Sequence, residues 1–93
     1  RLPDLRSRLR ALPIARIEPI DGALLSALLV KLFADRQLAV APGVVKYLTR
    51  HIERSSEAAR RVVEHIDRLA LATHRKVSRQ LAAEAVAATR NDE

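Results

Sequence analysis

The chain of 93 residues has no cysteine, only two glycines and only two aromatic residues, Phe33 and Tyr47. Without cysteine it forms neither disulfides nor thiolate metal sites. Its glycines, Gly22 and Gly43, satisfy neither the G-x-x-x-x-G-K-[ST] phosphate loop nor the G-x-G-x-x-G fingerprint. No apolar run approaches the roughly 18 residues that cross a bilayer, and no signal-peptide pattern is present. We therefore expect a cytoplasmic protein with no membrane partner.

The residues that are abundant favour helices and a positive surface. Hydrophobic residues make up 48% of the chain and are almost entirely Leu, Val, Ile and Ala, a composition suited to helices. The net charge is +6, and fourteen of the seventeen basic residues are arginine. Residues 1–20 carry +3 and residues 46–79 carry +5. This charge favours a partner that is acidic or a nucleic acid, but it does not decide the fold.

Apolar residues recur at helical spacing in four segments, which predicts an all-α fold with four helices. A helix capped by Asp21 extends to about Arg36, and a second helix starts at Pro42. A third starts after Ser55 or Ser56, and a fourth is capped by Ser78. The side chains expected in the core are Leu25, Leu28, Leu29, Leu32, Val44, Val45, Leu48, Ile52, Ala59, Val62, Val63, Ile66, Leu69, Ala70, Thr73, Leu81, Ala82, Ala85, Val86 and Ala88. Before this bundle, we expect a short helix over residues 4–12 and a short edge strand over residues 14–18.

The histidines do not indicate a metal site. His65 and His74 are nine residues apart, which places them on opposite faces of a helix, and His51 is fourteen residues before His65. Ser55 and Ser56 are explained as helix caps rather than as nucleophiles. We therefore expect no metal site and no self-contained enzyme.

Nucleic-acid binding is an alternative reading of the basic residues. The cations that would line a phosphate-binding face are Arg60, Arg61, Arg68, Arg75, Lys76 and Arg79. Acidic residues are interspersed on the same helix at Glu57, Glu64 and Asp67, and no aromatic platform for stacking bases is present. A solvated face of mixed charge is favoured, and a helical DNA-binding module stays open as the alternative.

Several stretches resemble the end of an AAA+ ATPase module of the DnaA clade, and within it the Hda-type regulatory inactivators of DnaA. The sharpest is PDLRSRL at residues 3–9, because in that clade a run ending in S-R-L or S-R-F carries the arginine finger. The supporting stretches are residues 17–21, 24–40, 47–55 and 62–78. The resemblance implies that residues 1–20 are the tail of the AAA+ core and residues 21–93 are the helical lid domain.

The resemblance also implies a function. Arg8 matches the arginine finger, which acts in trans on ATP bound to DnaA and so regulates the initiation of bacterial chromosomal replication at the nucleoid. The partners implied are DnaA and the DNA sliding clamp. ATP or ADP with Mg²⁺ would belong to the complete protein, and this part of it would bind no nucleotide alone. The lid of a full replication initiator is the other reading of the same resemblance.

One position departs from the family pattern. Glu57 occupies the sensor-two position, where the family has an arginine that touches the protein's own nucleotide. A carboxylate there would repel a triphosphate. Arg54 and Arg61 lie three residues before and four residues after it, and we expect them on the same face as possible substitutes.

The start of the chain at Arg1, without an initiator Met, fits the expectation of a C-terminal fragment. Residues 14–18 would then have lost their sheet. We expect them to pack on the bundle, to pair with a second copy of the chain, or to lack a fixed conformation.

Overall fold

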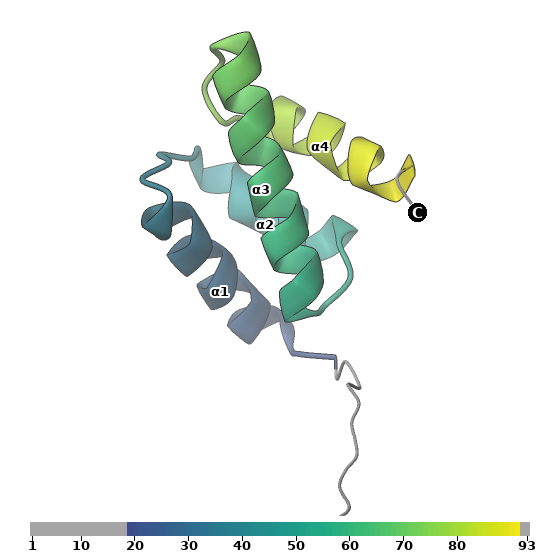
Figure 1. Cartoon of the computed structure of the whole chain (residues 1–93). Coiled ribbons are helices and arrows are strands. Elements are labelled where there is room, and N and C mark those ends of the chain that lie inside the picture. The colour runs from purple at the N-terminus through teal and green to yellow at the C-terminus, as the bar shows by residue number, and fades with distance from the viewer. Residues whose placement is uncertain (1–18, 92–93) are drawn as a thin grey trace, which may run out of the picture.

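Four helices follow one another in the computed structural model, which describes residues 19–91 (Figure 1). They are α1 (Gly22–Asp35), α2 (Pro42–His51), α3 (Ser56–Thr73) and α4 (Arg79–Asn91). The predicted all-α four-helix domain is therefore confirmed, and the described residues contain no strand. The helix expected over residues 4–12, the strand expected over residues 14–18, and Arg8 lie outside the described residues.

Each helix begins where a polar or proline residue predicts it. The carboxylate of Asp21 accepts a hydrogen bond from Leu24 N at 2.7 Å, and Pro42 occupies the first turn of α2. Of the two serines before α3, Ser55 is the cap, since its hydroxyl accepts from Ala58 N at 3.1 Å. The Ser78 hydroxyl accepts from Leu81 N at 3.2 Å at the start of α4. Replacing such a cap by alanine typically costs about 0.5–2 kcal/mol.

Two helices end on residues in the left-handed conformation. Gln37, with φ of 59°, follows the end of α1, and His74, with φ of 55°, ends α3. Leu38 N donates a hydrogen bond to Phe33 O at 2.9 Å, and Arg75 N donates one to Ala70 O at 3.2 Å. These bonds satisfy carbonyl groups that have no partner within the helix at its C-terminal end. Glycine usually occupies such positions, and neither of them has one.

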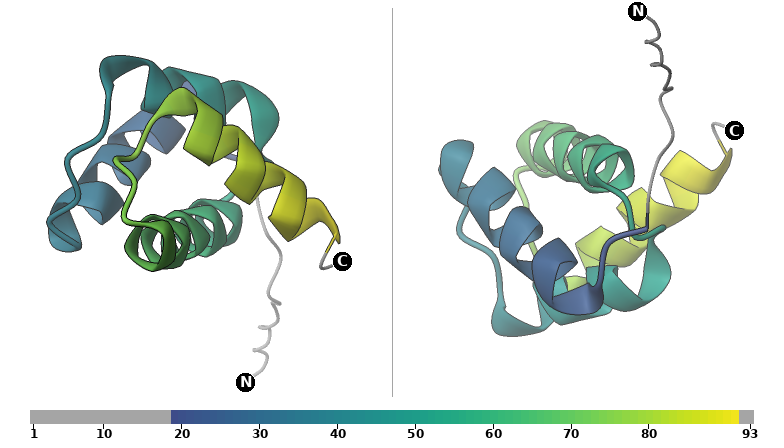
Figure 2. Two further views of the ribbon diagram at one scale, coloured as in Figure 1. Left: turned by 90° about the horizontal axis from the view of Figure 1, so that it is seen from above. Right: turned by 90° about the horizontal axis from the view of Figure 1, so that it is seen from below.

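The helices form a ring in the order α1, α2, α4, α3, as the two views along the bundle show (Figure 2). Helices α1 and α4 lie across the ring from each other, as do α2 and α3. The α1–α2 and α3–α4 loops meet at one end, where Val40 and Val77 form an isolated parallel bridge and Ala41 N donates to Val77 O at 3.2 Å. The bridge joins two loops that are far apart in the sequence.

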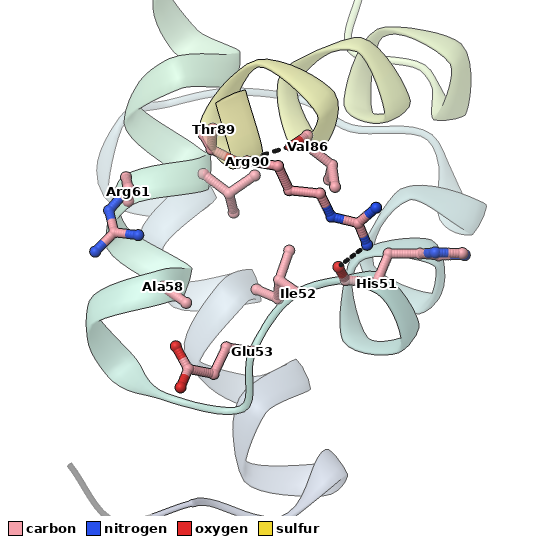
Figure 3. A pocket seen from close by; sticks show the side chains of 9 residues that line it. His51, Ile52, Glu53, Ala58, Arg61, Val86, Thr89 and Arg90 are labelled. Carbon is pink, nitrogen blue, oxygen red and sulfur yellow. Dashed lines mark hydrogen bonds between the residues drawn. The ribbon is translucent and has the colours of Figure 1, made fainter. Parts of the chain in front are cut away.

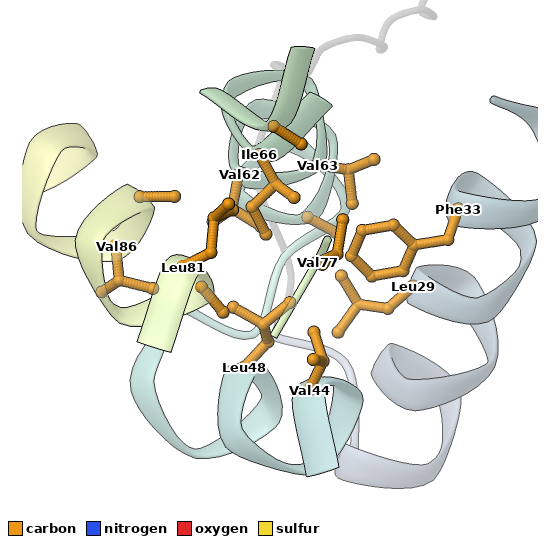
Figure 4. Packing of buried hydrophobic residues seen from close by; sticks show 14 of the residues in the cluster. Leu29, Phe33, Val44, Leu48, Val62, Val63, Ile66, Val77, Leu81 and Val86 are labelled. Atoms are coloured by element: carbon orange, nitrogen blue, oxygen red, sulfur yellow. The ribbon is translucent and has the colours of Figure 1, made fainter. Parts of the chain in front are cut away.

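All four helices contribute to one apolar core (Figure 4). The largest side chains that are almost completely buried are Phe33, Leu25, Leu29, Leu48, Ile66, Leu81, Val44, Val62 and Val63. The predicted positions Leu28, Leu32, Val45, Ile52, Leu69 and Ala88 are only partly buried. One predicted core residue is wrong: Thr73 is exposed, because it is the last residue of α3, and its hydroxyl donates to Leu69 O at 2.7 Å. Phe33, which the stripe of leucines did not include, is only 2% exposed.

None of the described helices is both long enough and apolar enough to cross a membrane.

Salt bridges join the helices on the outside of the ring. Arg36, at the end of α1, binds Asp67 on α3 at 2.7 Å. Arg75, in the α3–α4 loop, binds Glu84 on α4 through two parallel hydrogen bonds of 3.0 and 2.8 Å. The hydrogen bond from Arg75 lowers the pKa of Glu84 below its ordinary value of 4.5, with a smaller contribution from the opposite charge.

The lowered pKa of Glu84 predicts a pH-dependent contribution to stability. The Arg75–Glu84 pair is present above pH 4.5 and is lost as the pH falls through the pKa of the folded state. The variant Glu84→Gln should therefore melt slightly below the wild type at neutral pH, and the difference should disappear in acid. Thermal unfolding followed by circular dichroism at both pH values measures this. Glu64→Gln, which removes an exposed acid from α3, serves as the control. A difference of the same size in acid would contradict the prediction.

Candidate functional site

A pocket of about 400 Å³ opens at the end of the domain where α2 stops and α3 starts (Figure 3). Its walls come from the end of α2, the α2–α3 loop, the first turns of α3 and the end of α4. The residues that line it are His51, Ile52, Glu53, Ala58, Arg61, Val62, Val86, Thr89 and Arg90. Apolar side chains from three elements thus lie beside two arginines and one acid.

Backbone hydrogen bonds hold the α2–α3 loop in place beside this pocket. Ser55 N donates to Glu53 O at 2.8 Å, and the buried Ser55 hydroxyl caps α3. Ile20 N donates to Arg54 O at 3.0 Å. This last bond places the residues that lead into α1 beside the α2–α3 loop. Residues 19–21 therefore lie at the same end of the domain as the pocket.

Arg90 connects α4 to the end of α2 across the mouth of the pocket. Its Nη2 donates to the carbonyl oxygen of His51, the last residue of α2, at 3.4 Å (Figure 3). A cation at this place also complements the partial negative charge of a helix C-terminus. The hydrogen bond is long and exposed, so it contributes little to stability. The arginine is therefore able to exchange this carbonyl for another acceptor.

Glu57 and Arg61 lie on one face of α3, and the structure brings them together. Arg61 Nη2 is 3.4 Å from Glu57 Oε2, and both side chains are well exposed. An exposed pair of this kind, four residues apart on a helix, is worth only about 0.3–0.5 kcal/mol. Arg61 lines the pocket, whereas Glu57 does not. An anion that entered the pocket would compete with Glu57 for the guanidinium of Arg61.

Arg54 does not share that face. It precedes the cap Ser55, so it lies in the α2–α3 loop and not on α3. Its side chain is exposed. This corrects the expectation that Arg54, Glu57 and Arg61 lie on one helical face: the structure brings together only the last two.

Arg90 and Glu53 line this site although they were not among the residues expected to do so. Arg90 is a basic residue in the last turn of α4. The only sequence signal was a basic residue in the last turn of a helix, which many helices have. The described residues contain no group of three or more His, Asp or Glu side chains that could hold a metal ion.

A second pocket, of about 370 Å³, lies between α2 and the start of α4. The residues that line it are Gly43, Lys46, Tyr47, Arg50, His51 and Arg79. The rings of Tyr47 and His51 stack with their centres 4.1 Å apart. We refer to Lys46, Arg50 and Arg79 together as the basic pocket. The signal that could have revealed it is Lys46 and Arg50 at helical spacing in a helix without acids.

Six cations were candidates for a DNA-binding face. Two of them are already paired with acids in the structure. Arg61 pairs with Glu57, and Arg75 pairs with Glu84. Arg79 faces the basic pocket together with residues of α2 that were not among the six. The six cations therefore lie in different surroundings.

Comparison with known proteins gives no relative for the chain: no family model, no curated protein and no solved structure matches it.

Proposed function

We propose that the chain is the C-terminal part of a DnaA-clade AAA+ regulator of the Hda type, which promotes hydrolysis of the ATP bound to DnaA. Residues 21–93 are its lid domain, and Arg8 is the arginine finger that reaches the nucleotide of the neighbouring subunit. The observation that carries the proposal is the S-R-L run at residues 7–9 followed, from Gly22 on, by a domain of four helices.

The connection between the two parts supports this arrangement. The hydrogen bond from Ile20 N to Arg54 O ties the residues before α1 to the pocket end of the domain. A lid has to lie close to the ATPase core at that junction in order to close over a nucleotide. Two arginines, Arg61 and Arg90, line the pocket at this end. They are suitable donors for the phosphate oxygens of a nucleotide bound between core and lid.

The pair formed by Glu57 and Arg61 would affect how tightly the regulator binds its own nucleotide. The carboxylate of Glu57 partly neutralises the arginine nearest to it, and it would repel a triphosphate. The regulator would therefore bind its own ATP more weakly than a family member that has an arginine at this position. The phosphate loop and the acid that binds Mg²⁺ would come from the core that precedes this chain.

The role proposed for Arg8 follows from the chemistry of its side chain. A guanidinium stays charged at all relevant pH values and presents a planar set of donors to γ-phosphate oxygens. In phosphoryl transfer, such a group stabilises the negative charge of the transition state. Because the finger acts on a neighbour, its effect is measured on the ATP of DnaA and not on that of the regulator.

The test is a hydrolysis assay with the intact regulator. DnaA loaded with labelled ATP is incubated with the sliding clamp on DNA, with and without the regulator, and conversion to ADP is followed. The proposal expects faster conversion that depends on the clamp. Conversion at the same rate with and without the regulator would overturn the proposal.

A further inference from the structure

The basic pocket gathers three cations and no acid in one lining. Four other cations pair with acids: Lys31 with Asp35, Arg36 with Asp67, Arg61 with Glu57, and Arg75 with Glu84. Arg60 and Arg68 on α3 are exposed and have no such partner among residues 19–91, but they do not line a pocket. Lys46, Arg50 and Arg79 form no ion pair with any of residues 19–91. No acidic residue lines the pocket. Three positive charges thus converge there without a counter-charge from the described part of the chain.

Two features of these cations work against helix stability, whereas Arg50, in the last turn of α2, is favoured by the helix dipole. Lys46 and Arg50 are four residues apart on α2, where like charges repel each other. Arg79 is the first residue of α4, at the positive end of the helix dipole. In addition, α2 has no acid in its first turn, and its N-cap residue, Ala41, makes no side-chain hydrogen bond. An anion bound in the pocket would reduce the repulsion between these cations.

The donors around the pocket are of the kinds that contact the phosphates of nucleic acids. Proteins contact the DNA backbone mainly through Arg and Lys, through hydroxyl groups such as that of tyrosine, and through backbone N–H groups at helix starts. The pocket supplies Lys46, Arg50 and Arg79, the side chain of Tyr47, and Gly43 in the first turn of α2. A phosphate group could approach the backbone of Gly43 closely, because a Cβ added there meets no atom within 4 Å.

An acidic peptide fits this pocket less well. Peptide recognition draws most of its affinity from apolar or aromatic anchors buried in a pocket. Of the residues that line the basic pocket, only Tyr47 and His51 are aromatic, none is aliphatic, and these two rings already stack on each other. A repeated phosphate charge without side-chain anchors matches the lining better.

We propose that the basic pocket between α2 and α4 binds the sugar–phosphate backbone of duplex DNA without regard to sequence. This binding is independent of the hydrolysis activity proposed above, because it belongs to the chain itself and is measured without DnaA or nucleotide.

The experiment measures binding of the full 93-residue chain to a short fluorescein-labelled duplex of arbitrary sequence, by anisotropy, at salt concentrations from about 50 to 200 mM. The pocket variant is Arg50→Gln with Arg79→Gln. The matched control is Arg60→Gln with Arg68→Gln, which removes two exposed arginines from α3, across the ring from α2. Circular dichroism establishes that both double variants are folded.

We expect the wild type to bind with an affinity that falls steeply with salt. The pocket variant should bind about tenfold more weakly at low salt, with the slope of log K against log salt reduced by about 1.8, because each lost phosphate contact removes about 0.9. The control should keep nearly the wild-type slope.

Three results would overturn the proposal. The first is no DNA binding by the folded wild type, and the second is an equal loss of slope in both variants, which indicates a diffuse charge effect. The third is binding of a labelled polyglutamate peptide more tightly than DNA, with that binding lost in the pocket variant. The third result would assign the pocket to an acidic protein instead.

Discussion

Under the proposed function, replacing Arg8 by alanine in the intact protein is expected to reduce the stimulated hydrolysis of DnaA-bound ATP by about 10³- to 10⁵-fold, up to the complete loss of stimulation. The reason is electrostatic. The guanidinium is proposed to stabilise charge that develops only in the transition state, so its removal affects the rate of hydrolysis and not the assembly of the complex. The measurement is the single-turnover rate of ATP hydrolysis on DnaA in the presence of the loaded clamp.

The neighbouring arginines provide matched controls for this experiment. Arg6 and Arg10 lie two residues to either side of Arg8, and Arg6→Ala or Arg10→Ala removes the same charge from the same segment. Both variants should retain most of the stimulation. Arg8→Lys keeps the charge but loses the planar fork, so it should restore little activity. If Arg8→Ala stimulates as well as Arg10→Ala does, Arg8 is not the finger.

Replacing Phe33 by alanine should lower the free energy of unfolding by about 3–5 kcal/mol. Phe33 is 2% exposed and is the one phenylalanine of the chain, packed from α1 into the centre of the core near Leu29 and Val77 (Figure 4). Its removal leaves a cavity that aliphatic neighbours cannot fill without moving. A small domain has a total free energy of unfolding of only about 5–15 kcal/mol, so this one change removes a large part of it.

Urea unfolding followed by circular dichroism measures the loss at Phe33. Leu24→Ala is the control, because Leu24 lies on the same helix but is 55% exposed. That variant should change the free energy by no more than about 0.5 kcal/mol. Equal losses for both variants would show that Phe33 is not part of a well-packed core.

The sequence predicts where the helices start better than where they end. Asp21, Pro42 and Ser78 each mark the start of a helix, because a cap acts through the side chain of a single residue. The ends depend on Gln37 and His74 in the left-handed conformation, and neither residue type predicts it. The Val40–Val77 bridge was likewise not predictable, since it depends on how two distant loops are brought together.

In the candidate sites, too, only the contacts within one helix could be predicted from the sequence. Glu57 and Arg61 were predicted to share a face because a helical spacing fixes their relation, and the structure pairs them. The other contacts are tertiary. Arg90 reaches His51 from the far end of the chain, and Arg79 joins Lys46 and Arg50 only because α4 packs on α2. No pattern within one helix contains that information.

The bridge between Val40 and Val77 makes the two ends of the domain different. It fastens the α1–α2 and α3–α4 hairpins to each other at their turns. At the opposite end, the bonds from Ile20 to Arg54 and from Arg90 to His51 connect the elements, and the second is long and exposed. The two hairpins are therefore joined at both ends, by the Val40–Val77 bridge at their turns and by the α2–α3 loop beside the pocket.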